Sequence, residues 1–134
     1  MATSAPLIVI LAAGKGTRMN SARPKALHEV AGLSMLGHVL RLAGSIDGAK
    51  LAVVIGPGMD DVAAETARLA PRAEVFVQTT QAGTADAVLA ARACLDAHSG
   101  DVIVLYGDTP LIQASTVAAL REALNGGAGV AVLG

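Results

Sequence analysis

Short apolar runs alternate with amphipathic stretches along the whole chain. Each run carries few polar side chains, which is typical of strands that are buried on both faces of a parallel sheet. The first run is closed by Gly14, and we expect it to form the central strand. Five strands are predicted in all, at residues 7–13, 51–55, 74–78, 101–106 and 128–133.

The stretches between these runs carry apolar residues at the three- and four-residue spacing of amphipathic helices. Ser34 can cap a helix that presents Met35, Val39 and Leu42 on one face. The next predicted helix has acidic residues in its first turn and a basic residue in its last turn, an arrangement that suits both ends of the helix dipole. The three later helices are expected at residues 60–70, 85–97 and 115–125.

Strand and helix alternate at the rhythm of right-handed βαβ units. The sequence therefore predicts the α/β class and a Rossmann-like three-layer α/β/α fold with a mostly parallel sheet, of which residues 1–134 form one unit. The last predicted strand ends close to Gly134, which is an unusual place for a domain to finish. We therefore expect this fold to be incomplete at the C-terminus.

Composition supports a folded core and argues against one class of partner. Hydrophobic residues make up 53% of the 134 residues and charged residues 16%, which favours a globular domain over disorder. Phe76 and Tyr106 are the only aromatic residues, so the core is aliphatic. The net charge of −1, without a basic patch, disfavours nucleic acid as a partner.

The N-terminus and the single cysteine bear on location. No cluster of positive charge precedes the first apolar run, and no apolar stretch is long enough to span a bilayer. Cys94 excludes an internal disulfide and is interpreted as a small buried side chain in a reducing compartment. We expect a cytoplasmic protein with no secretory signal and no membrane partner.

Three polar stretches follow predicted strands, at residues 14–25, 78–84 and 106–110. Ligands of open α/β sheets bind at the carboxyl ends of the strands, so we expect these stretches to converge on one side. In the first, Gly14 and Gly16 let the backbone approach a ligand and direct amide N–H groups at phosphate oxygens. Arg18 offers a fork of donors for a phosphate, and Lys25 offers a mobile positive charge.

Two common phosphate-binding motifs do not fit this first stretch. A dinucleotide fingerprint needs a third glycine where Met19 stands, and a Walker A loop needs Gly-Lys followed by Ser or Thr, whereas Lys15 precedes Gly16. On the glycines alone, a tight structural turn remains an alternative. The presence of Arg18 and Lys25 in the same stretch favours phosphate binding.

The other two stretches leave alternatives open. Gln78 or Gln81 could contact the edge of a base, and Thr84 could contact a phosphate or cap the following helix. Asp108 follows a buried strand and is a reasonable magnesium ligand, because magnesium uses one or two carboxylates beside substrate phosphates and water. Asp108 could equally serve only to turn the chain before Pro110.

Together the three stretches resemble the uridyltransferase domain of the bacterial enzymes that make UDP-N-acetylglucosamine from UTP and N-acetylglucosamine-1-phosphate. The first motif is shared by sugar nucleotidyltransferases generally and by the guanylyltransferase of molybdenum cofactor synthesis, whereas the motifs at residues 24–28 and 106–111 point to the uridyltransferase. The matching segments are Leu11-Ala12-Ala13-Gly14-x-Gly16-Thr17-Arg18-Met19, Ser21, Pro24-Lys25-x-Leu27-His28, Gly83-Thr84-Ala85 and Tyr106-Gly107-Asp108-x-Pro110-Leu111.

The resemblance covers nearly the whole chain, and the chain covers a little more than half of that family's catalytic domain. One departure is Asp86, which stands where the family commonly has His. A carboxylate that faces a phosphate site would be unfavourable, so Asp86 bears on specificity.

The resemblance implies a nucleotidyltransferase fold and a set of site residues. Arg18 and Lys25 would bind and polarise phosphates as the catalytic residues, and Asp108 would hold Mg²⁺. Gln78, Gly83 and Thr84 would contact the uridine. The full nucleotide site would consist of Leu11, Ala12, Ala13, Gly14, Gly16, Thr17, Lys25, Gln78, Gly83, Thr84, Tyr106 and Gly107.

The resemblance also implies a reaction and partners. N-acetylglucosamine-1-phosphate would attack the α-phosphorus of UTP, giving pyrophosphate and a precursor for peptidoglycan and lipopolysaccharide. The partners would be UTP and the sugar-1-phosphate, within a bifunctional enzyme that trimerises through a C-terminal acetyltransferase domain absent from this sequence. Two alternatives stay open: another nucleotidyltransferase of this fold with a different base or acceptor, and a nucleotide-binding fragment without turnover.

Overall fold

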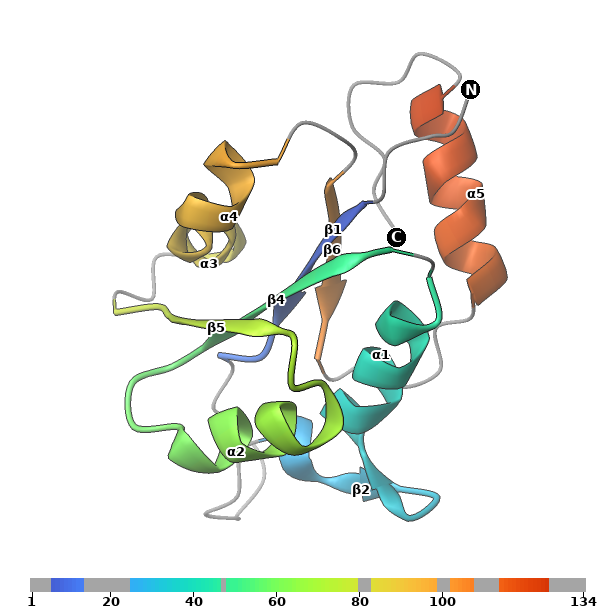
Figure 1. The fold of residues 1–134 in the computed structure, drawn as a ribbon. Helices are drawn as coiled ribbons and strands as arrows, with labels where there is room; N and C mark the ends of the chain where they lie inside the picture. The colour runs from blue at the N-terminus through green and yellow to red at the C-terminus, as the bar shows by residue number, and fades with distance from the viewer. Residues whose placement is uncertain are drawn as a thin grey trace.

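The computed structural model describes residues 6–13, 25–46, 48–79, 83–98, 102–107 and 114–125. Within these ranges four strands form one fully parallel sheet in the order β5-β4-β1-β6 (Figure 1). The strands are β1 (Leu7–Leu11), β4 (Lys50–Ile55), β5 (Glu74–Val77) and β6 (Val102–Tyr106). The prediction of a parallel sheet with the first strand in its interior is confirmed, because β1 pairs with β4 on one side and with β6 on the other.

Helices cover both faces of this sheet, which confirms the three-layer prediction (Figure 1). One face packs against α1 (Met35–Gly44), α2 (Asp60–Leu69) and α5 (Ala114–Asn125), and the other against α3 (Thr84–Ala90) and α4 (Arg92–Asp96).

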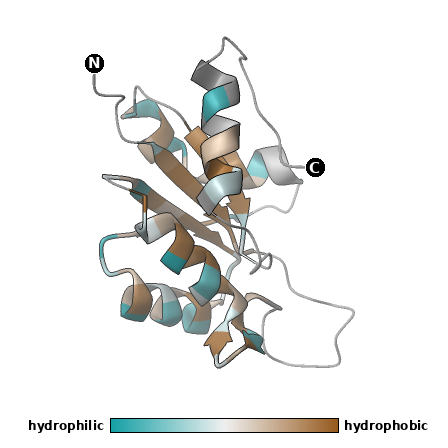
Figure 2. Cartoon of the chain, turned by 90° about the vertical axis from the view of Figure 1, so that its right-hand side faces the viewer, coloured by the Kyte–Doolittle hydropathy of each residue, from teal (hydrophilic) through white to brown (hydrophobic). Residues whose placement is uncertain are grey.

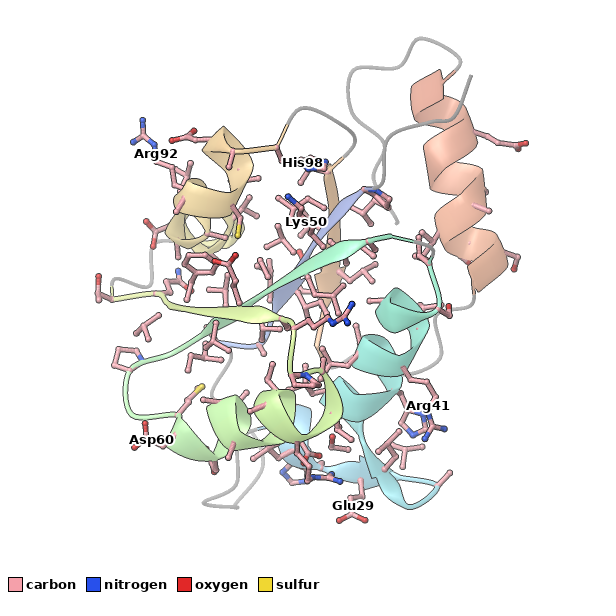
Figure 3. All side chains as sticks on the ribbon, in the orientation of Figure 1. Glu29, Arg41, Lys50, Asp60, Arg92 and His98 are labelled. Carbon is pink, nitrogen blue, oxygen red and sulfur yellow. The ribbon has the colours of Figure 1, made fainter. Side chains whose placement is uncertain are left out.

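Side chains of β1 alternate between the two faces. Ile8 and Ile10 are fully buried on the side of α1, α2 and α5, while Leu7 and Val9 are buried on the side of α3 and α4. Figure 2 shows the result as hydrophobic strands enclosed by helices that turn hydrophilic residues outward. Charged side chains such as Glu29, Asp60 and Arg92 point away from the sheet in Figure 3.

The helix boundaries follow the signals in the sequence. The Ser34 Oγ accepts a 2.9 Å hydrogen bond from the Gly37 N–H and caps α1, as predicted. Asp60 and Asp61 lie in the first turn of α2 and Arg68 lies in its last turn. The hydroxyl of Ser34 also donates to Glu65 Oε2 at 2.7 Å, and this contact ties the start of α1 to α2.

Two features differ from the sequence prediction. The helix expected over 85–97 is divided at Ala91, which is fully buried against the sheet and has helix-breaking angles of φ −92° and ψ 22°. A 3₁₀ turn (Lys25–Leu27) and a small hairpin of β2 (Glu29–Val30) and β3 (Leu33–Ser34) lie in a segment for which no helix or strand was predicted. The strand predicted at 128–133 lies outside the described residues.

Cys94 is only partly buried, so the prediction of a buried side chain holds in part. It packs against the cluster on the α3 and α4 side of the sheet. Burial raises the pKa of the Cys94 thiol, and the neighbouring carboxylate of Glu74 raises it further, while Lys50 opposes this with a smaller effect. The thiol is therefore in its neutral form at physiological pH.

Candidate nucleotide-binding site

The carboxyl ends of the strands bring the three chemistry-bearing stretches to one edge of the sheet. Backbone pairing continues one residue beyond three strands: Ala12 N–H donates to Val54 O at 2.7 Å, Gln78 N–H to Ile55 O at 2.8 Å, and Gly107 N–H to Leu11 O at 2.9 Å. These three bonds fix the points from which the stretches leave β1, β5 and β6. The convergence is thus shown for the strand ends from which the three stretches leave, and it stays a prediction for residues 14–24.

The ends of β1 and β6 lie so close together that the site needs a residue without a side chain at position 107. Gly107 is buried, and a Cβ there would lie 3.2 Å from the Ala12 Cβ and 3.3 Å from the Leu11 carbonyl oxygen. Real Cβ contacts are rarely so short, so a larger residue would push the two strand ends apart. Ala12 and Ala13 are also buried, while Tyr106 is exposed. Leu11, Ala12 and Gly107 are therefore closely packed where β1 and β6 end.

Gln78 is the most informative side chain at this edge. It is only 5% exposed, although it lies just beyond the end of β5. Its side-chain amide donates from Nε2 to Asp86 Oδ2 at 2.9 Å. Buried polar groups need a partner, and here that partner is a carboxylate supplied by another element. Sequence reasoning selected Gln78 but gave no partner for it.

The helix α3 holds Asp86 in place. The helix starts at Thr84, and Gly83 occupies the N-cap position with φ 103°, a left-handed value that favours glycine. Gly83, and not Thr84, thus occupies the N-cap position, and the roles considered for the Thr84 hydroxyl stay predictions because that side chain lies outside the described part of the chain. Asp86 lies in the first turn, where the helix dipole favours a negative charge. Ala87, the next residue, is buried against the sheet.

The 3₁₀ turn Lys25–Leu27 anchors the backbone of Lys25 near α1 and α2. Ala26, in the middle of this turn, is 3% exposed and joins the core between those helices and the sheet. The carbonyl oxygen of His28 accepts a hydrogen bond from the Met35 N–H at 2.9 Å. The buried Nε2 of the His28 ring has no hydrogen-bond partner among the residues that the structure describes. The described part of the Pro-Lys-x-Leu-His motif, residues 25–28, thus has its backbone held against the core.

Several predicted site residues lie outside the described ranges. They are Gly14, Gly16, Thr17, Arg18 and Asp108, and for Lys25 and Thr84 only the backbone is described. Their roles stay predictions. Among the residues that the structure describes, no group of three or more His, Cys, Asp or Glu side chains gathers in a way that could hold a metal ion by itself. Within the same ranges, no helix is long and apolar enough to cross a membrane.

The fold and the converging strand ends define this chain as an α/β protein of the nucleotidyltransferase type. A search of solved structures supports this class: 4-diphosphocytidyl-2C-methyl-D-erythritol synthase matches with a TM-score of 0.73 and 20% identity, covering 96% of this chain and 58% of that one. A manganese complex of Rv0371C from Mycobacterium tuberculosis matches with a TM-score of 0.66 and 22% identity, covering 92% of this chain and 61% of that one. At these identities the likeness concerns the fold.

Sequence comparison gives the family. Residues 8–134 match the model of the MobA-like NTP transferase domain, and the chain belongs to this family. It is 56% identical over 128 residues to the bifunctional protein GlmU of Xanthobacter autotrophicus, covering 96% of this chain and 29% of the relative. It is 54% identical over 134 residues to the GlmU of a Bradyrhizobium species, covering 100% of this chain and 30% of the relative. The chain thus spans about 30% of the length of these curated relatives.

Proposed function

We propose that this chain forms the nucleotide-binding part of a uridyltransferase that joins UTP to N-acetylglucosamine-1-phosphate, releasing pyrophosphate. The observation that carries the proposal is the convergence of Ala12, Gln78 and Gly107 at the carboxyl edge of one sheet, in a chain 56% identical to a bifunctional GlmU protein. Gln78 and the end of β1 are separated by β4, which corresponds to about 10 Å at the usual strand spacing. A nucleotide laid across this edge would place its base near Gln78 and its phosphates at the stretch after β1.

The chemistry that this site would perform is an in-line displacement at the α-phosphorus. The attacking phosphate oxygen is already largely ionised at neutral pH, so no general base is required. The protein's task is to align the two substrates and to neutralise the charge of the triphosphate. Arg18 would hold phosphate oxygens through its forked donors, and Lys25 would add a point charge from a backbone anchored at the 3₁₀ turn.

Magnesium fits the donor set of this chain. No three-ligand cage is found among the described residues, and magnesium held by substrate phosphates needs only one or two protein carboxylates. Gly107, hydrogen-bonded to Leu11, directly precedes Asp108, the carboxylate proposed as ligand. The manganese complex of a protein with the same fold is consistent with metal dependence. When bound, the ion would neutralise charge on the phosphates.

The proposal is tested by pyrophosphate release. Because the chain spans about 30% of its curated relatives, turnover is measured in a fusion in which residues 1–134 replace the matching segment of the Xanthobacter relative. Each of the four nucleoside triphosphates is supplied with a panel of sugar-1-phosphates and magnesium. We expect turnover with UTP and N-acetylglucosamine-1-phosphate, and turnover only with another nucleotide would contradict the assignment.

Three variants test the roles of individual residues in the fusion. Arg18→Ala and Lys25→Ala should each reduce kcat roughly 10²- to 10³-fold without unfolding the protein, because each removes an electrostatic contact. Lys50→Ala is a matched control, since Lys50 is exposed at the amino end of β4, away from the site. Asp108→Asn should raise the magnesium concentration needed for half-maximal rate. Wild-type rates in both cation variants, or an unchanged magnesium requirement, would contradict the assigned roles.

A further inference from the structure

The geometry points to Asp86 as a positioning residue that fixes which end of the Gln78 amide faces the base of the bound nucleotide. The inference rests on the proposed function, in which Gln78 contacts the base, and deepens it by naming what sets base selectivity. Its basis is the 2.9 Å hydrogen bond from Gln78 Nε2 to Asp86 Oδ2. The charge of Asp86 and its place in the first turn of α3 would not by themselves support this role.

Gln78 differs from the other buried polar side chains of the described residues. Those are Ser34, which caps α1, and Thr66, whose hydroxyl donates to the Val62 carbonyl one turn earlier in α2. Both hydroxyls bond within the layer of α1 and α2, because Ser34 also donates to Glu65 of α2. The hydrogen bond of the Gln78 amide instead crosses from the end of β5 to α3, at the edge where the site lies. A buried amide held in this way fits a role in recognition.

The chemistry of a carboxylate settles the orientation of the amide. The two ends of a glutamine amide have nearly the same shape, and rotation by 180° exchanges donor for acceptor. An ionised carboxylate only accepts hydrogen bonds, so it selects the orientation in which Nε2 faces Asp86. The amide oxygen Oε1 then lies on the opposite branch and is available as an acceptor.

Both partners are held by rigid elements. The backbone of Gln78 is tied to β4 through its N–H bond to Ile55 O at 2.8 Å. Asp86 lies between Gly83, whose carbonyl accepts from the Ala87 N–H at 3.1 Å, and Ala91, which is fully buried. The amide is therefore oriented before any ligand binds, which lowers the entropic cost of recognition.

An acceptor oxygen at this position selects bases by their ring nitrogen. Uracil carries a proton on the ring nitrogen of its pairing edge and can donate to Oε1. Cytosine presents an unprotonated nitrogen there, which would face the oxygen as a second acceptor. Leaving a buried polar group unpaired in this way typically changes binding about 10- to 100-fold. Asp86 thus favours UTP over CTP through Gln78.

The test is base selectivity, measured as the UTP/CTP ratio of kcat/KM in the fusion and as the ratio of Kd values for the 134-residue chain. Asp86→Ala should lower both ratios about 10- to 100-fold, with the change in KM rather than in kcat. Asp86→Asn keeps an acceptor but adds donors, and it should fall between the wild type and Asp86→Ala. Circular dichroism checks that each variant is folded.

Two further variants separate positioning from a general effect of charge. Asp61→Ala removes a carboxylate from the first turn of α2 without affecting Gln78, and it should leave the ratios unchanged. In the background of Gln78→Ala, the change Asp86→Ala should have no additional effect, because Asp86 acts through Gln78. Ratios within twofold of wild type in Asp86→Ala, or an equal loss in Asp61→Ala, overturn the inference.

The outcomes distinguish this inference from the proposed function. Turnover with UTP together with an unchanged ratio in Asp86→Ala overturns the inference alone. If the chain binds UTP selectively, Asp86→Ala abolishes that selectivity, and the fusion releases no pyrophosphate, the proposed function alone is overturned. Failure of the chain and the fusion to bind any nucleotide overturns both.

Discussion

The hydroxyl of Ser34 connects two helices, and its removal gives a sharp test of how the fold is held together. The side chain is 4% exposed. Its oxygen accepts from the Gly37 N–H at 2.9 Å as the cap of α1 and donates to Glu65 Oε2 of α2 at 2.7 Å. Ser34→Ala keeps the backbone and most of the volume but deletes both bonds.

The expected loss can be worked out from these two contacts. Removing an N-cap costs roughly 1 kcal/mol. A hydrogen bond to a charged group contributes roughly 1.5 kcal/mol at the lower end of its range, which suits the partly exposed Glu65. The free energy of unfolding should therefore fall by about 2.5 kcal/mol, which corresponds to roughly 8–12 °C in Tm for a chain of this length.

The same hydroxyl also predicts a dependence on pH. The Ser34 hydrogen bond is the main factor that lowers the pKa of Glu65; partial burial opposes it, and Arg68 lowers the pKa further. A carboxylate with a lowered folded-state pKa stabilises the protein above its unfolded pKa, near 4.5, and this stabilisation is lost as the pH falls through the folded-state pKa. The difference between wild type and Ser34→Ala should therefore shrink below pH 4.5.

The assay is urea unfolding of the 134-residue chain, followed by far-UV circular dichroism at pH 7 and at steps below pH 4.5. Ser45→Ala is the matched control, because the Ser45 hydroxyl donates to the Leu42 carbonyl at 2.6 Å in an exposed position at the other end of α1. The control should change stability by less than about 0.5 kcal/mol. A loss in Ser34→Ala no larger than in the control, or a difference independent of pH, would refute the reasoning.

Two other predictions concern the strand ends and the thiol. Gly107→Ala should lower the free energy of unfolding by about 1–3 kcal/mol and reduce nucleotide affinity, because its Cβ would press on Ala12 and on the Leu11 carbonyl. The control Gly44→Ala, with no atom within 4 Å of its Cβ, should be neutral or stabilising. Urea unfolding and nucleotide titration measure both variants, and equal effects would contradict the prediction. The rate of Cys94 alkylation by iodoacetamide should have its pH midpoint higher in the folded chain than in urea, because burial and Glu74 raise the thiol pKa. Glu74→Gln should lower this midpoint. Coincident pH profiles of the folded and unfolded chain would contradict a raised pKa.

The sheet and its helices were predictable because each strand is marked by its own apolar run. The hairpin of β2 and β3 was not, since its strands have two residues each and its turn is Ala31-Gly32. Both turn residues have positive φ, 54° and 81°, and alanine is an unusual residue for that conformation. The break at Ala91 is equally hidden, because neither Gly nor Pro marks it. Tertiary packing decides both features.

The site shows the same division between local and tertiary information. The strand ends and the role of Gln78 as a candidate base contact followed from motif and position. The pairing of Gln78 with Asp86 did not, because the two are eight residues apart and belong to different elements. From the sequence, Asp86 was a possible source of repulsion near a phosphate. In the structure its carboxylate accepts a hydrogen bond from the Gln78 amide. The departure from the family pattern at position 86 therefore bears on recognition of the base, through Gln78.

The position of the site is set by the packing of the two cores on the sheet. Leu11 pairs with both Val54 and Tyr106, so the stretches after β1 and β6 leave the sheet at the same level. Because side chains alternate between the faces, a slip of one residue in either neighbour would move Val53 or Leu105 from one core to the other. Both of these side chains are fully buried, and such a slip would cost several kcal/mol at typical burial energies. The cores therefore hold the strand ends in register, and specificity is left to the few side chains beyond them, of which Gln78 and Asp86 form the pair that the structure describes.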